Sequence, residues 1–382
     1  MIKKSFLILS LVLFAFSSCK KQGTGSLFFP AAPAESGPDY SKLQPDCFNP
    51  YANTPLIGPG NDFFTVDLGN NKRASTWGDP HVLKIGGEFI MYASSLPNDR
   101  ANDTVEHIAV YRLTSSNGIN WTLSPTAPVF QRTGAATWDA DGTETPSVVF
   151  YKNEYHMFYT SYPSDFSAAT TYRVGHAKSP DGITWTRVTA GAPLIAPTDP
   201  NNTTPQLTFN QYVTAEPGAV VFNDKIYLYY AATGSNLEAN STAEVIGLMT
   251  FDGTTWSAQQ EVMRPSQAVY PRLTSPYYKG FSTPAATIIN NQVHLFTTAV
   301  IQKDDQGVAY KHTKIHHAYS ADGESNWVQD TTAITDIAEL GWHSFDIISP
   351  TALQDGNTVY LWHGGNNGAL TGLGIGLMTC DL

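Results

Sequence analysis

The sequence contains few charged residues and few cysteines. Charged side chains make up 14% of the 382 residues, whereas aromatic residues reach 12%, and 30 glycines and 24 prolines are spread along the chain. This composition is typical of many short strands joined by turns, and it argues against an all-α fold built from long, salt-bridged helices. Three cysteines in a chain of this length also exclude a small fold held together mainly by disulfides.

Basic residues are scarce as well. The chain has 22 Lys and Arg against 33 Asp and Glu, which gives a formal net charge of -11, and no cluster of Lys or Arg follows residue 21. Such a protein repels a phosphate backbone. We therefore expect no nucleic-acid partner.

The first residues read as an export signal. Lys3 and Lys4 precede an apolar run over residues 6–16. This run is too short for a permanent transmembrane helix, but it has the length of a signal-peptide core. We expect a signal peptide over residues 1–18.

The end of this signal resembles the lipobox of bacterial lipoproteins, in which small residues lead to a lipidated Cys. Here the phrase is Phe16-Ser17-Ser18-Cys19, and a stretch rich in Gly, Pro, Ser and Ala follows it. The resemblance implies a lipid on Cys19 and a tether over residues 19–58, with the membrane a partner through this anchor only. The protein would then be an outer-membrane lipoprotein on the periplasmic face or the cell surface. The alternative is an ordinary secretory signal with an incidental Cys.

Two cysteines remain, Cys47 after the tether and Cys380 near the C-terminus. In an oxidising compartment they could pair and join the two ends of the folded region. Two buried free thiols are an equally good interpretation of the spacing.

A phrase ending in Trp recurs four times. Each copy carries Asp-Gly or Asn-Gly shortly before the Trp, and the Trp residues are 64, 71 and 71 residues apart. Asp-Gly and Asn-Gly favour tight hairpin turns, and the Trp that follows can clamp the next strand onto its neighbour. Near-constant spacing indicates tandem structural units. The four positions are Trp121, Trp185, Trp256 and Trp327.

A second, Pro-containing phrase recurs five times, and an aromatic-rich alternating run follows each copy. Each unit thus predicts a Pro-led strand, an aromatic strand and two further strands. Tandem four-stranded units of this size are the blades of a β-propeller. We therefore predict an all-β fold, a five-bladed β-propeller of antiparallel blades over residues 59–382. The five phrases contain Asp79-Pro80, Glu144-Thr145-Pro146, Glu216-Pro217, Ser282-Thr283-Pro284 and Ser349-Pro350.

The last unit stops early. Residues 375–381 repeat residues 246–252 almost letter for letter, and the chain ends there. The fifth blade therefore lacks its own fourth strand and would leave an open sheet edge. We expect an N-terminal strand, over residues 62–68, to complete this blade and close a monomeric ring.

The first strands of propeller blades line the central channel, so residues beside the recurring Pro should meet at one mouth. Asp79, Glu144 and Glu216 are three such residues at equivalent positions of three repeats. Crowded carboxylates raise at least one pKa, so that one group holds a proton while another stays ionised. Glycoside hydrolysis needs this division between an acid and a base.

Trp77-Gly78-Asp79-Pro80, the repeat and its five-fold count resemble the five-bladed β-propeller glycosidases, in particular glycoside hydrolase family 43 and its relatives. That family typically acts on arabinose- or xylose-containing glycans with inversion, with an Asp base in the first blade, an Asp that tunes the acid in the third and a Glu acid in the fourth. The resemblance implies that Asp79 is the base and that Glu216 matches the third-blade position.

The fourth blade departs from this pattern, because Ser282-Thr283 stands where a Glu is expected. Either Glu216 acts as the acid, helped by Glu144, or the protein is a non-catalytic glycan-binding propeller lipoprotein. Both interpretations imply an oligo- or polysaccharide partner and no cofactor. Fructosides are less favoured, because the Asn-Asp-Pro-Asn-Gly opening of the fructan-acting relatives is absent.

Further residues are candidates for substrate binding because they lie just before, or on, the inner strands. Exposed indoles there could stack on a sugar face, although half of such tryptophans only pack. One His in the fifth unit resembles a family His that supports a central ion or water, but it has no spaced partners, so we predict no metal site. The substrate-binding candidates are His81, Trp138, Asp139, Trp342, His343 and Asp346.

Overall fold

The computed structural model describes most of the chain from residue 37 onward. Among the described residues, no helix is long and apolar enough to cross a membrane. The described residues are 37–58, 72–99, 104–105, 107–134, 137–163, 172–188, 191–199, 208–236, 241–266, 277–303, 311–337, 341–368 and 373–382.

The described chain is built almost entirely from strands, with three short 3₁₀ helices, η1 (Tyr40–Lys42), η2 (Pro45–Cys47) and η5 (Gly341–His343). The strands are β1 (Asn49–Pro50), β2 (Lys72–Ile85), β3 (Glu88–Asp99), β4 (Thr104–Val105), β5 (Ala109–Ser115), β6 (Thr122–Leu123), β7 (Gly142–Tyr151), β8 (Glu154–Tyr162), β9 (Arg173–Ser179), β10 (Thr186–Arg187), β11 (Val213–Phe222), β12 (Lys225–Asn236), β13 (Ser241–Phe251), β14 (Gln260–Met263), β15 (Tyr277–Ile289), β16 (Gln292–Lys303), β17 (Lys311–Ser320), β18 (Val328–Gln329), β19 (Thr335–Asp336), β20 (Asp346–Asp355), β21 (Thr358–Asn366) and β22 (Gly374–Asp381).

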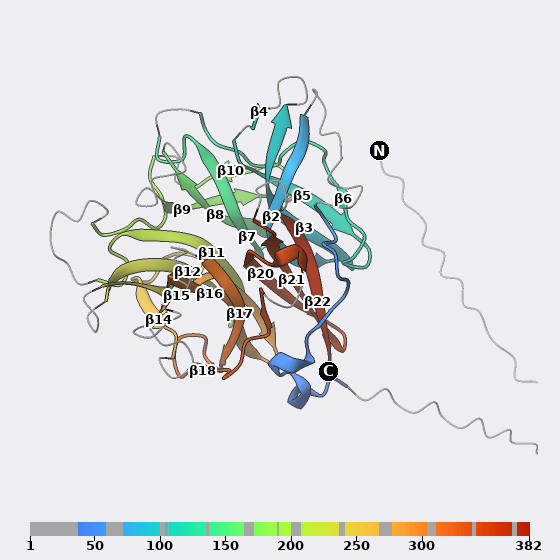
Figure 1. Cartoon of the computed structure of the whole chain (residues 1–382). Coiled ribbons are helices and arrows are strands. Elements are labelled where there is room, and N and C mark those ends of the chain that lie inside the picture. Colours follow the sequence, from blue (N-terminus) through green and yellow to red (C-terminus); the bar gives the residue numbers. More distant parts are fainter. Residues whose placement is uncertain are drawn as a thin grey trace, which may run out of the picture. The chain divides into compact units, whose positions relative to one another are not determined.

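Consecutive strands pair antiparallel into four-stranded units (Figure 1). The units are β2-β3-β5-β6, β7-β8-β9-β10, β11-β12-β13-β14, β15-β16-β17-β18 and β20-β21-β22 with β1, here called sheets one to five. A single parallel contact between Glu244 and Gly280 joins sheets three and four. The prediction of an all-β fold with four-stranded antiparallel sheets is thereby confirmed.

The first strands of the sheets lie against one another. β2 contacts β7, β7 contacts β11, β11 contacts β15, β15 contacts β20, and β20 contacts β2. These long-range contacts bring together segments that are widely separated in the sequence, so residues at one end of the five first strands share one region of the molecule.

The N-terminal part of the described chain packs against sheet five. Asn49 and Pro50 pair with Thr379 and Met378, and Ile57 bridges Ile375 farther along β22. Residues 62–68, which we expected to pair with the open edge of this sheet, lie outside the described residues. The compact unit starts at Pro38, earlier than the boundary at residue 59 that the sequence suggested.

A disulfide fixes the same contact, because Cys47 is bonded to Cys380, with 5.1 Å between their Cα atoms. The structure thus favours pairing over two free thiols. Around this bond, Leu43 and Phe48 join a buried cluster with residues of sheets four and five, including Phe296 and Leu361.

The recurring Trp residues pack between sheets. Each indole lies near an aromatic ring at the fifth residue of the aromatic strand in the preceding sheet, whereas the sequence suggested a clamp on an adjacent strand. Sheet five has no such Trp, and Phe48 fills the corresponding place. The pairs and their centroid distances are Trp185 and Tyr92 (5.8 Å), Trp256 and Phe158 (5.7 Å), Trp327 and Tyr229 (5.9 Å), Phe48 and Phe296 (6.0 Å), and Trp121 and Trp362 (6.1 Å).

Candidate active site

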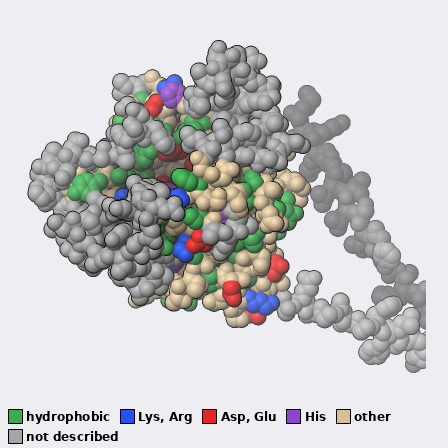
Figure 2. All heavy atoms as spheres, viewed as in Figure 1, with side chains coloured by type: hydrophobic (Ala, Val, Ile, Leu, Met, Phe, Trp, Pro, Cys, Tyr) green, Lys and Arg blue, Asp and Glu red, His purple; other side chains and the backbone are tan. Residues whose placement is uncertain are grey.

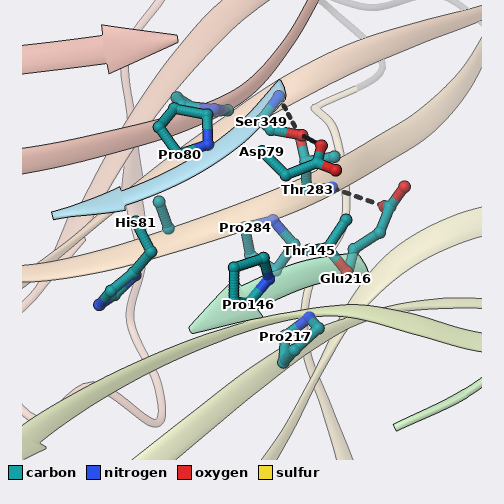
Figure 3. A pocket seen from close by; sticks show the side chains of 12 residues that line it. Asp79, Pro80, His81, Thr145, Pro146, Glu216, Pro217, Thr283, Pro284 and Ser349 are labelled. Carbon is teal, nitrogen blue, oxygen red and sulfur yellow. Dashed lines mark hydrogen bonds between the residues drawn. The ribbon is translucent and has the colours of Figure 1, made fainter. Parts of the chain in front are cut away.

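The residue before each recurring Pro has an unusual backbone. All five have a left-handed φ between 45° and 54° although none is Gly, and each lies at a break in the pairing of its strand with the next. A left-handed non-Gly residue costs about 1–3 kcal/mol and persists only where the surroundings impose it, most often at functional sites. Figure 3 shows these residues and the following prolines around one small cavity of about 30 Å³. The five are Asp79, Thr145, Glu216, Thr283 and Ser349.

This geometry corrects one expectation. Asp79 and Glu216 occupy equivalent positions, but the equivalent residue of sheet two is Thr145. Glu144 lies one residue earlier, before the break in strand pairing. Its carboxyl group therefore starts from a different backbone position, two residues before the Pro instead of directly before it.

The three carboxylates nevertheless meet. Asp79, Glu144 and Glu216 line one cavity of about 360 Å³, together with Asp346 and His312. Acidic side chains are visible inside a hollow in Figure 2. The other lining residues are Thr76, Gly78, Ser94, Ser95, Leu96, Ile108, Thr145, Tyr172, Ile348, Asn366 and Leu373.

Two of the carboxylates accept hydrogen bonds from residues of other sheets. The Ser349 hydroxyl donates to Asp79 Oδ1 over 2.6 Å. Glu216 Oε2 accepts from the Ser282 hydroxyl and, over 2.9 Å, from the Thr283 backbone N–H. The position where the family resemblance expects a Glu thus holds two donors to Glu216.

Glu144 differs from these two. Within the described part of the chain, no hydrogen bond reaches its carboxyl group. Burial raises the pKa of Glu144 well above its usual value, and the charges of Asp79 and Glu216 raise it further. No described residue donates a hydrogen bond that would favour the ionised form, so burial and the neighbouring charges both favour the neutral acid.

The pKa of Glu216 is also raised by burial, but His312 and the donors Ser282 and Thr283 oppose this effect. The carboxylate of Glu216 is therefore better supported than that of Glu144. When neighbouring carboxyl groups share one proton, it resides on the group with the weaker support for its charge.

His312 is a basic side chain near Glu216. Its backbone N–H donates to Asp346 Oδ1 over 2.9 Å, and its Nδ1 lies 3.5 Å from the same oxygen. Burial alone would lower the pKa of His312, but Asp346, Glu216 and Glu244 outweigh it and the pKa is raised. No motif pointed to His312 or Tyr172, because neither stands in a recurring phrase.

The other substrate-binding candidates do not line this cavity, except for Asp346. His81 faces the interior below the prolines, where its Nε2 lies 2.7 Å from the Val148 carbonyl oxygen and burial lowers its pKa to about 4. Asp139 is fully buried and forms an ion pair with Arg187.

The two tryptophans pack against aromatic rings. Trp138 stacks on Tyr159, with 5.9 Å between the centroids, and Trp342 stacks on His363 at 5.2 Å. His343 is buried beside Trp342, and burial lowers its pKa to about 3. Both tryptophans thus lie just before a first strand, as expected, but their rings pack against residues of their own sheets.

Comparison with known proteins agrees with this fold. The sequence model of one protein family, described as the glycosyl hydrolases family 32 N-terminal domain, matches residues 143–273 of this chain. This range includes Glu144 and Glu216. No curated protein matches the chain.

Solved structures match over most of the chain. One glycoside hydrolase has a TM-score of 0.63 at 16% identity, covering 90% of this chain and 94% of its own length. A thermostable family-43 glycoside hydrolase has a TM-score of 0.56 at 15% identity, with 81% and 89% covered. The β-1,2-mannobiose phosphorylase from Listeria innocua, in complex with β-1,2-mannobiose, has a TM-score of 0.59 at 11% identity, with 87% and 96% covered. The predicted resemblance to propeller-type glycoside hydrolases, family 43 among them, is thus confirmed at the level of the fold.

Proposed function

We propose that the protein is a glycoside hydrolase with Asp79 as base and Glu144 as general acid. The observation that carries the proposal is the convergence of Asp79, Glu144 and Glu216 in one cavity. Asp79 and Glu216 accept hydrogen bonds there, whereas no described residue donates one to the carboxyl group of Glu144. An acid that stays protonated beside an ionised base is what cleavage of a glycosidic bond requires.

This assignment differs from the sequence-based hypothesis, which made Glu216 the acid. Glu216 has two donors and faces His312, so it serves better as a fixed negative charge. Its charge raises the pKa of Glu144 and keeps the proton there. Asp79 accepts a hydroxyl hydrogen bond and stays available to deprotonate a water.

The scaffold that we infer for this site is a closed ring of five blades. The cyclic contacts of the first strands support it, as do the five equivalent aromatic pairs between sheets. In this ring the pairing of Asn49 and Pro50 with β22 supplies the last blade with its outer strand.

For the substrate we propose arabinose- or xylose-containing or related glycans, cleaved with inversion at the anomeric carbon. The support is the resemblance to family 43, together with a cavity large enough to hold a sugar. Proton NMR of the first product formed distinguishes the outcomes, because a product that retains the anomeric configuration contradicts inversion.

The decisive experiment compares substrates with different leaving groups. Glu144→Gln should lose about 10²- to 10⁴-fold of the rate on a natural glycan. It should keep most of the rate on a dinitrophenyl glycoside, whose leaving group needs no proton. Asp79→Asn should lose both activities, and the exposed Glu154→Gln neither. If Glu216→Gln shows the leaving-group pattern instead, Glu216 is the acid.

A second candidate function is binding of glycans without cleavage. Ser282 and Thr283 at the fourth-blade position favour it, because the family acid is missing there. Oligosaccharide binding measured by calorimetry, with no product released at high protein concentration, would establish this function instead.

We also propose that Cys19 is lipidated and that the protein is anchored in the outer membrane on its periplasmic face or at the cell surface. Tyr40, near the start of the compact unit, accepts a hydrogen bond from Gln354 over 3.3 Å. Gln354 lies at the opposite end of β20 from Asp346, which lines the cavity. Tyr40 thus lies at the end of β20 away from the cavity. Metabolic labelling with a fatty acid, lost in Cys19→Ala, tests the lipid.

A further inference from the structure

Ser349 makes a short contact with Asp79. It stands before Pro350 in β20 with φ 51°, it is 7% exposed, and its hydroxyl lies 2.6 Å from Asp79 Oδ1. Figure 3 shows this bond beside the one from Thr283 to Glu216. The two residues come from the first strands of sheets one and five and are 270 residues apart in the sequence.

The serine is itself held in place. Its backbone N–H donates to Thr283 Oγ1 over 3.3 Å, and that oxygen lies 2.6 Å from Thr298 Oγ1. The left-handed backbone at residue 349 sets the direction of the side chain, and Pro350 restricts the residue further. The hydroxyl is therefore a fixed donor, with little freedom to follow a moving carboxylate.

A fixed donor of this kind matters for a base. The terminal torsion of an Asp side chain is broad, so an unsupported carboxylate samples many orientations. A hydroxyl that donates to one oxygen holds the plane of the carboxylate and stabilises its charge. The second oxygen, Oδ2, is then left to accept a proton from water.

We propose that Ser349 is a positioning residue for Asp79, holding Oδ1 so that Oδ2 is presented to the attacking water. This inference rests on the proposed function, because it assigns Ser349 to the base of that reaction. Ser282 offers the matched case, since its hydroxyl donates in the same way to Glu216.

The test uses variants that differ only in the hydroxyl. Thr fits the backbone, because Thr145 and Thr283 occupy the equivalent position with φ 46° and 45°. Ser349→Thr keeps the hydroxyl, whereas Ser349→Val has nearly the same shape without it. Ser349→Ala and Ser282→Ala complete the set, the latter as the control on Glu216.

We expect Ser349→Ala and Ser349→Val to lose about 10- to 100-fold in kcat, with KM within about twofold, because a hydrogen bond to a charged group is lost. The acid limb of the kcat/KM profile should move to higher pH, since the ionised base loses a donor. Ser349→Thr should restore both. Ser282→Ala should leave the acid limb in place.

Two results would overturn the inference. One is a pair of Ser349→Thr and Ser349→Val variants with equal rates and equal pH profiles. The other is a loss of rate in Ser349→Val without any movement of the acid limb, which indicates a structural role only. Carbon-13 NMR separates these from failure of the proposed function. The signal of the Asp79 carboxyl carbon should change its chemical shift in Ser349→Val but not in Ser349→Thr, even if no glycan is cleaved, and an unchanged signal in Ser349→Val contradicts the contact itself.

Discussion

Trp185 of sheet two lies edge-on against Tyr92 of sheet one, with 5.8 Å between the ring centroids. The Tyr92 hydroxyl also donates to the carbonyl oxygen of Gly182, in the turn that precedes the Trp, over 2.7 Å. Tyr229 and Gly323 repeat this bond between sheets three and four. The Asp-Gly turn and its Trp therefore dock one sheet onto the preceding sheet, which explains why the phrase recurs once per unit.

Trp185→Ala should destabilise the protein by about 1–3 kcal/mol, because a half-buried indole and an edge-to-face pair are lost. Val188→Ala, on the same sheet and exposed, should change stability by less than about 0.5 kcal/mol. Urea unfolding followed by tryptophan fluorescence measures both. Equal effects of the two substitutions would contradict the docking role of the Trp.

The disulfide between Cys47 and Cys380 should stabilise the contact between the N-terminal part of the described chain and sheet five. Replacing both cysteines with Ser should lower the free energy of unfolding by about 2–5 kcal/mol. A reducing agent should then have no further effect on the variant, although it destabilises the parent. An unchanged unfolding midpoint in the variant would show that the pairing of β1 with β22 is enough to hold these two segments together.

Close approach of the first strands makes Gly218 irreplaceable. A Cβ at this position would lie 2.0 Å from the Pro284 carbonyl oxygen, so neighbouring backbones would have to separate. Gly218→Ala should therefore abolish folding or lower the melting temperature strongly. Gly191→Ala is the control, because a Cβ there meets no atom within 4 Å. A normal melting temperature for Gly218→Ala, measured by circular dichroism, would argue against this packing of β11 on β15.

The pH dependence of stability should reveal Glu144. Burial raises its pKa in the folded state above the unfolded value near 4.5. The contribution of Glu144 to the stability of the fold is therefore fully present at a pH below its unfolded pKa. This contribution is lost as the pH rises through its folded pKa. Glu144→Gln stays neutral, so it should melt at a higher temperature than the parent at pH 8.

The difference between Glu144→Gln and the parent should shrink as the pH falls below 4.5, where the parent carboxyl becomes protonated in both the folded and the unfolded state. Calorimetry at several pH values provides the measurement. A variant that is less stable than the parent at pH 8 would mean that the folded protein stabilises the ionised form of Glu144, which would contradict the assignment of Glu144 as the acid.

Much of the site could be predicted from the repeat. The phrases around Asp79 and Glu216 mark the same backbone position in two units, and their sheets do bring them to one cavity. Glu144 is not at the position equivalent to Asp79 and Glu216, because the break in strand pairing follows it and Thr145 takes the left-handed backbone. Trp138 and Trp342 precede inner strands as expected, but the space beside them is filled by Tyr159 and His363.

Local sequence alone determined the tandem sheets, because turn residues, alternation and a recurring Trp act over a few residues at a time. It also determined that acidic side chains stand beside the recurring prolines. The hydrogen bonds and the charge that distinguish these carboxyl groups come from Ser349, Ser282 and His312. These residues are distant in the sequence, and only the packing of first strands against one another brings their donors within hydrogen-bond reach or their charge close enough to act.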